Sequence, residues 1–149
     1  MKIGWLGLAM IAGLLVPAQA AMNAKMRTFV LNPTYSAMIN FGVGAVMLVF
    51  LMAAAVAQGQ AGSWRGALEA PWWAWCGGLI GAMFVTTAIL AVPRIGSASY
   101  SVAVIAGQLI AAIVLDHLGA LGLPQHSASL SRIGGALLLL AGVWLIQRG

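Results

Sequence analysis

Five polar side chains stand inside otherwise apolar stretches of this sequence, where they could hydrogen-bond a small solute. They are Gln19, Asn23, Asn40, Ser101 and Gln108. In a membrane-spanning helix a polar group is unfavourable unless it meets a partner or water, so such groups face a bundle interior or a hydrated cavity. The alternative is that they bond to one another between helices, each bond contributing about 0.6–2 kcal/mol. For Thr86 and Thr87 we expect hydrogen bonds to carbonyls of their own helix.

Residue patterns that support catalysis or metal binding are missing from the sequence. There is no Gly-rich phosphate loop, no His-x-x-x-His pair, no cysteine cluster and no Gly-x-Ser-x-Gly motif. Asp116 and His117 are the only acid–base neighbours, but adjacent helical residues point about 100° apart and form no ready dyad. We therefore expect no enzyme activity, no cofactor and no metal. Asp116 and Arg94 stand at helix ends, as interface charges or as parts of a gate.

The composition indicates a protein that crosses the membrane several times. Hydrophobic residues make up 62% of the 149 residues, charged residues 6%, and the mean hydropathy is +1.01. A soluble domain carries about 25% charged residues, so this chain lacks the polar surface that water requires. The seven Lys and Arg residues are scattered singly between apolar runs. They are typical of interface anchors in a lipid bilayer, and they exclude a nucleic-acid-binding patch, which would need clustering.

The apolar runs predict an all-α membrane protein with five transmembrane helices in a single domain over residues 1–149. About 20 helical residues cross the roughly 30 Å hydrocarbon core. The first run, with Lys2 before it and Ala18-Gln19-Ala20 near its end, also imitates a secretory signal. Its apolar character continues past Ala20 into a chain that is itself membrane-embedded, so we expect a helix. The predicted spans are 3–24, 34–57, 72–92, 97–115 and 131–147.

Local signals predict where these helices begin, end and bend. Asn32 before Pro33 is typical of a helix start. Pro17 should kink the first span. We expect a loop over residues 58–70, a break at Pro93-Arg94, and Ser131 as the cap of the last span.

Small residues form a stripe along the fourth predicted span. A four-residue spacing relates Ser99, Ala103, Gly107 and Ala111, so they share one helix face. Such stripes let two helix backbones approach closely in lipid. Gly135 and Gly142, seven residues apart on the last span, predict a second close-approach face. We expect both faces to pack in a dimer.

The distribution of positive charge barely favours one orientation in the membrane. With five spans, one side carries three cations and the other four. The first set is Lys2, Arg65 and Arg132, and the second is Lys25, Arg27, Arg94 and Arg148. Because orientation follows an excess of Lys and Arg on the cytoplasmic side, we expect weakly specified or dual topology.

Several segments, in the same order along nearly the whole chain, resemble the YdcZ-type inner-membrane exporter family of the drug/metabolite transporter superfamily. They are Pro17–Ala24 (PAQAAMNA), Asn40–Gly44 (NFGVG), Pro71–Gly81 (PWWAWCGGLIG), Val92–Gly96 (VPRIG), Ala106–Leu109 (AGQL) and Asp116–Gly119 (DHLG). The resemblance implies a five-helix half-transporter in a bacterial inner membrane. Larger members of the superfamily contain two such units in opposite orientation around a midplane site. A half-size chain would recreate this arrangement by pairing with itself as an antiparallel homodimer or with a sister subunit.

One departure from related proteins bears on the substrate. The small multidrug resistance proteins carry a membrane-embedded glutamate in their first helix, which binds protons and cations. Here the first predicted helix carries Gln19 and Asn23, which cannot titrate. A neutral or zwitterionic metabolite, or an anion drawn by Lys25 or Arg94, fits these residues at least as well as a cationic drug.

Two functions are compatible with the sequence. The first is a small secondary transporter, an exporter of a small metabolite or drug-like solute, acting as a dimer. The second is a non-transporting accessory or assembly subunit, whose small-residue stripe docks on a larger membrane complex.

Overall fold

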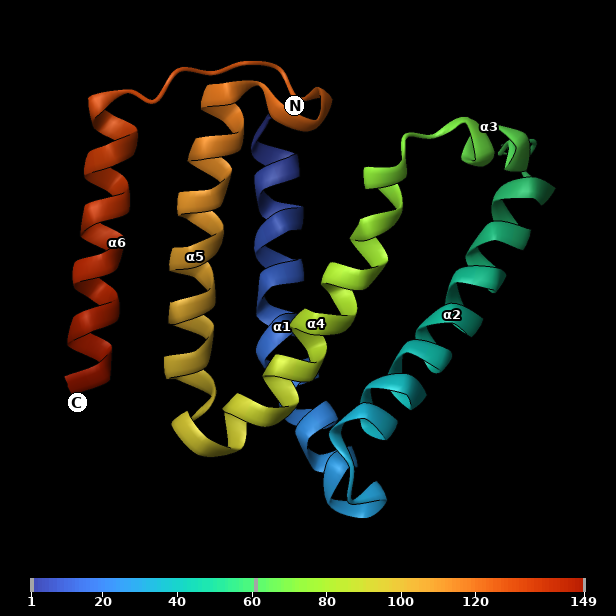
Figure 1. The fold of residues 1–149 in the computed structure, drawn as a ribbon, viewed down its shortest axis with the longest axis horizontal. Coiled ribbons are helices and arrows are strands. Elements are labelled where there is room, and N and C mark those ends of the chain that lie inside the picture. Colours follow the sequence, from blue (N-terminus) through green and yellow to red (C-terminus); the bar gives the residue numbers. More distant parts are fainter. Residues whose placement is uncertain (1, 61, 149) are drawn as a thin grey trace. The chain divides into compact units, whose positions relative to one another are not determined.

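The computed structural model describes residues 2–60 and 62–148, and this part of the chain is helical throughout, with short connections (Figure 1). The elements in order are α1 (Lys2–Val30), α2 (Pro33–Ala57), α3 (Trp64–Glu69), α4 (Trp72–Ile95), α5 (Ser97–Leu118), the 3₁₀ turn η1 (Ala120–Gly122) and α6 (Leu130–Arg148). Five of the described helices are long and apolar enough to cross a membrane: α1, α2, α4, α5 and α6. The prediction of an all-α membrane protein with five spanning helices is confirmed.

The first helix is longer than the sequence predicts. It continues past residue 24 to Val30, and thereby includes Lys25 and Arg27. Long cationic side chains can extend to the membrane interface while their backbone stays helical, so the charges do not end the helix. The end comes at Leu31, whose φ is +58° and whose N–H donates to the Arg27 carbonyl at 2.8 Å. Pro17 lies inside α1, and Figure 1 shows the two halves of this helix running in different directions.

The start of α2 is as predicted. The Asn32 side chain accepts hydrogen bonds from the N–H groups of Thr34 at 2.8 Å and Tyr35 at 3.2 Å, and Pro33 begins the helix. The cap of α6 lies two residues earlier than the sequence predicts. The helix begins at Leu130, and the N–H of Arg132 donates to the Ser129 hydroxyl at 3.3 Å, so Ser129 takes the role expected of Ser131. The two serine hydroxyls are 2.9 Å apart.

Two further expectations about boundaries are wrong. Residues 58–70 are not all loop, because Ser63 caps the short helix α3 by accepting from the Gly66 N–H at 3.1 Å. Pro93 and Arg94 do not break α4, which ends at Ile95. Pro93 lacks only the N–H that would reach the Ile89 carbonyl, so one bond is lost this close to the helix end. The Arg94 guanidinium donates to the next carbonyl, that of Leu90, at 2.6 Å. The turn follows at Gly96, whose φ of +81° favours glycine.

The chain forms two compact units, Met1–Arg94 and Ile95–Gly149. In the first, α1 packs on α2, and Ala37 of α2 forms a small buried cluster with Val85 and Ile89 of α4. In the second, α5 packs along α6. Most long apolar side chains of these helices are exposed, as expected of surfaces that face lipid. The single domain over residues 1–149 stays a prediction.

Candidate functional site

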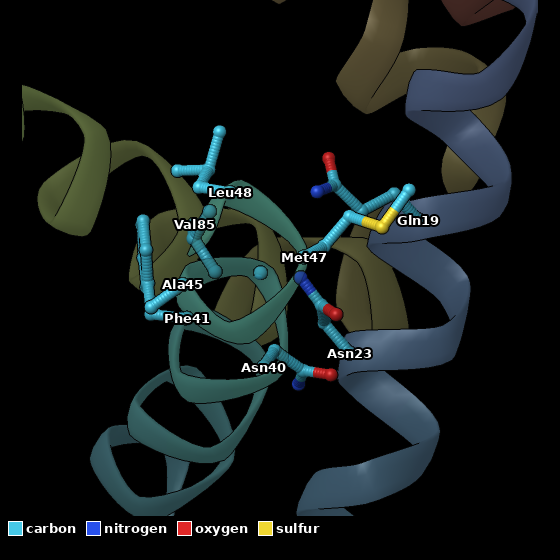
Figure 2. Close-up of a pocket in the computed structure, with 9 residues that line it drawn as sticks. Gln19, Asn23, Asn40, Phe41, Ala45, Met47, Leu48 and Val85 are labelled. Atoms are coloured by element: carbon cyan, nitrogen blue, oxygen red, sulfur yellow. The ribbon is translucent and has the colours of Figure 1, made fainter. Parts of the chain in front are cut away.

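A groove in the first unit brings together three of the five predicted polar residues. Its volume is about 450 Å³. Gln19 and Asn23 of α1 line one side, and Asn40 joins them from α2 (Figure 2). The remaining lining is apolar: Phe41, Gly44, Ala45, Met47, Leu48 and Val85.

The spacing of these residues and the short connection between α1 and α2 explain why they meet. Gln19 and Asn23 are four residues apart, so they lie on one face of α1. Only Leu31 and Asn32 separate α1 from α2, which makes the two helices neighbours. The fully buried Ser36 then fixes their contact, because its hydroxyl donates to the Asn23 carbonyl at 2.7 Å.

Asn40 is held by the same serine. Its side-chain nitrogen donates to the Ser36 carbonyl at 2.8 Å and lies 3.5 Å from the Ser36 hydroxyl. The side-chain oxygen of Asn40 forms no hydrogen bond with the described residues, and in Figure 2 it points toward α1. Asn40 therefore presents an acceptor to the groove.

Asn23 is the most informative residue of the groove. Only 3% of it is exposed, yet its side-chain amide forms no hydrogen bond with any residue that the structure describes. Among those residues, no fully buried side-chain nitrogen or oxygen lacks a partner, so the Asn23 amide must reach the groove. Gln19 is exposed and its amide is likewise unbonded within the described chain. The alternative of interhelical hydrogen bonds requires these three amides to bond to one another, and they do not.

The groove has no charged wall. No Lys, Arg, His, Asp or Glu is among its lining residues in the described chain. Nor does any group of three or more His, Cys, Asp or Glu side chains in residues 2–60 and 62–148 lie together as a metal site would require. The chemistry that the groove offers is hydrogen bonding beside apolar contact.

The other two predicted polar residues, Ser101 and Gln108, belong to α5 in the second unit. Ser101 is half-buried and Gln108 is exposed. Their part in binding a solute stays a prediction. Thr86 and Thr87 donate to the carbonyls of Ala82 and Met83 at 2.8 Å, so the expectation that they bond their own helix is confirmed.

The second unit contains a largely apolar groove between α5 and α6, of about 520 Å³, which ends at an ion pair. Asp116 of α5 and Arg132 of α6 are 3.1 Å apart there. The main chain of Asp116 also accepts from the His126 N–H at 2.7 Å, and His117 Nδ1 accepts from the Ala128 N–H at 3.2 Å. Asp116 and His117 therefore hold the 119–129 loop against the end of α5. Gating by Asp116 or Arg94 stays a prediction.

The small-residue stripe on α5 is open over most of its length. Ala103, Gly107 and Ala111 are exposed, and Ser99 is half-buried. A Cβ atom added to Gly107 would meet nothing within 4 Å, and the same is true of Gly135 and Gly142 on α6. Dimer packing on these faces stays a prediction.

Sequence reasoning did not identify the roles of four residues that the structure shows. Ser36 is four residues before Asn40, a spacing that could have linked the two side chains. Phe41 and Val85 look like ordinary lipid-facing or core residues, and no sequence signal marks them as groove lining. The pairing of Arg132 with Asp116 could have been suspected, because Asp116 is one of only two acidic residues in the chain.

Comparisons with known proteins agree on one family. The family model described as "Putative inner membrane exporter, YdcZ" matches residues 4–145. The chain is 33% identical to the "Inner membrane protein YdcZ" of Escherichia coli (strain K12) over 111 residues, which cover 74% of this chain and 72% of the relative. No solved structure shows a significant match. With its five spanning helices, the chain is a multi-pass protein of a bacterial inner membrane.

Proposed function

Because the chain belongs to the YdcZ family of inner membrane exporters, we propose that it exports a small polar solute and binds that solute in the groove beside Gln19, Asn23 and Asn40. The proposal rests chiefly on Asn23. Asn23 as a residue is only 3% exposed, but its amide reaches the groove and has no hydrogen-bond partner among the described residues, and a polar group in a membrane-embedded site is favourable only where a ligand or water bonds it. A solute in the groove would supply those bonds.

We further infer that the working unit is a dimer. Larger members of the superfamily that this family resembles contain two five-helix units around a central site, and the described chain supplies five spanning helices. Polar lining on one copy would then face polar lining on the other, and water or solute would occupy the space between. Transport would follow from rocking of the two copies about this site.

The experiment compares solute release from cells that express the wild type, Asn23→Leu or Gln147→Leu. Leucine has nearly the shape of asparagine but no hydrogen-bonding groups, and Gln147 is an exposed residue near the end of α6, outside the groove. We expect one or more solutes to accumulate in the medium with the wild type and Gln147→Leu, and to fall at least tenfold with Asn23→Leu at equal membrane abundance. Indistinguishable media from all three strains would refute the proposal. Loss of a co-purifying membrane protein without any change in the medium would support an accessory role instead.

A further inference from the structure

The groove is lined by amides and by apolar side chains. Figure 2 shows Gln19 and Asn23 on α1, with Asn40 and the apolar Met47 turned toward them from α2, and the apolar side chains of Phe41, Leu48 and Val85 farther from α1, on the other side of α2. A solute that contacts both kinds of side chain must itself be amphipathic, with one polar end and one apolar part. A fully polar solute such as a sugar would leave the apolar side chains unmatched.

The three amides specify the hydrogen-bonding pattern of the polar end. Asn23 offers two donors and one acceptor, all without partners in the described chain, and Asn40 adds an acceptor because its nitrogen is bound to Ser36. Gln19 adds both kinds of group at the more exposed side. A polar group that both donates and accepts, as a carboxamide or lactam does, satisfies these amides.

The absence of charge on the described lining favours an uncharged solute over an ion. A cation or anion that leaves water for a membrane-embedded site loses its hydration, and an opposite charge there is the strongest offset to that loss. The nearest cationic residues in sequence do not line the groove. Lys25 lies over the ring of Phe29, 5.5 Å from its centre, and Arg27 is one turn beyond Asn23 on α1. Arg27 would repel a cation near the groove and could attract an anion.

From these observations we infer that the groove takes an uncharged amphipathic solute with a carboxamide-like group bound by Asn23. This inference rests on the proposed function, because it names the substrate class of the same groove. It separates this chain from carriers whose membrane-embedded carboxylate selects cations.

Three probes of nearly identical shape test it: benzamide, benzamidinium and benzoate, which are neutral, cationic and anionic. Binding to the full chain in nanodiscs is measured by saturation-transfer NMR, with empty nanodiscs to subtract partition into lipid. We expect benzamide to bind at least tenfold more tightly than either ion. Asn23→Leu should weaken benzamide binding about tenfold, the effect of losing one good hydrogen bond, and Gln147→Leu should leave it unchanged.

Two further variants sharpen the result. Gln19→Leu changes an exposed side chain, so it keeps the test valid if Asn23→Leu fails to fold, and it should also weaken benzamide. Asn23→Asp puts a carboxylate in the same groove and should reverse the preference, so that benzamidinium binds more tightly than benzamide. Preference of the wild type for benzamidinium or benzoate would overturn the inference, and so would binding that ignores every groove variant or no binding of any probe.

These outcomes are distinct from failure of the proposed function. Asn23-dependent release of a solute together with an ionic preference would keep the exporter and reject the uncharged class. Asn23-dependent benzamide binding without any solute release would keep the ligand class and reject export.

Discussion

Ser36 is the residue on which the geometry of the groove depends. It is fully buried, its hydroxyl donates to the Asn23 carbonyl, and its own carbonyl receives the Asn40 amide. One serine thus sets the separation of α1 and α2 and restricts the rotamer of Asn40. The amides that face the groove are aligned by a residue that is not itself among its lining residues.

Ser36→Ala should therefore lower stability and disturb the groove together. Loss of the hydrogen bond to the Asn23 carbonyl should cost about 0.5–1.5 kcal/mol, since a hydrogen bond between protein groups has this net worth. The midpoint of thermal unfolding in detergent should fall, and benzamide binding should weaken. Ser127→Ala, in the exposed loop before α6, is the matched control and should change neither. An unfolding midpoint equal to that of the wild type would remove Ser36 from this role.

Among the elements, the long helices follow directly from the sequence, because hydropathy and length alone define them. The shared face of Gln19 and Asn23 is also predictable, since it depends only on helical geometry. The approach of Asn40 to Asn23 depends instead on the axial register of α2 against α1. That register is fixed by the buried bond from Ser36 and by the end of α1 at Leu31, neither of which a span prediction contains.

Some helix ends can likewise be predicted from adjacent residues, and others cannot. Asn32 acts on the N–H groups of its own helix, so its role could be read from adjacent residues. The end of α4 could not, because proline predicts a break and the helix continues to Ile95 before Gly96 turns the chain. The pairing of Arg132 with Asp116 depends on the path of a loop whose residues carry no strong pattern.

Gly96, in the turn between α4 and α5, has a strict backbone requirement. Its φ of 81° and ψ of 156° lie in a region that is essentially restricted to glycine. Gly96→Ala should destabilise the chain by about 1–3 kcal/mol, the usual cost of this conformation for other residues. Gly13→Ala, at a helical position where a Cβ would meet nothing within 4 Å, should be neutral or slightly stabilising. Equal unfolding midpoints for the two variants, measured by differential scanning fluorimetry, would show that the turn at Gly96 adapts to a side chain.

At the scale of the whole molecule, the exposed stripe on α5 predicts how two copies associate. Gly107 has free space around it, so a partner helix could approach its backbone closely. Gly107→Leu should fill that space and raise the dimer dissociation constant at least tenfold, measured by single-molecule photobleaching in liposomes. Gly78→Leu on α4, also at an open position, is the control and should leave association unchanged. Equal dimer fractions for Gly107→Leu and the wild type would place the dimer contact elsewhere.

The charge distribution makes a second prediction at this scale, about orientation. Three cations against four give almost no bias, so single chains should insert in both directions, and an antiparallel dimer becomes possible. C-terminal fusions to a cytoplasmic and to a periplasmic reporter should then both be active in the same host. Arg94→Ala leaves three cations on each side of the membrane, so both reporter fusions should stay active. Two lysines added after Gly149 should raise the four to six, hold the C-terminus in the cytoplasm and abolish the periplasmic signal. A wild-type chain that activates only one reporter would exclude an antiparallel homodimer, and pairing would then require a parallel copy or a sister subunit.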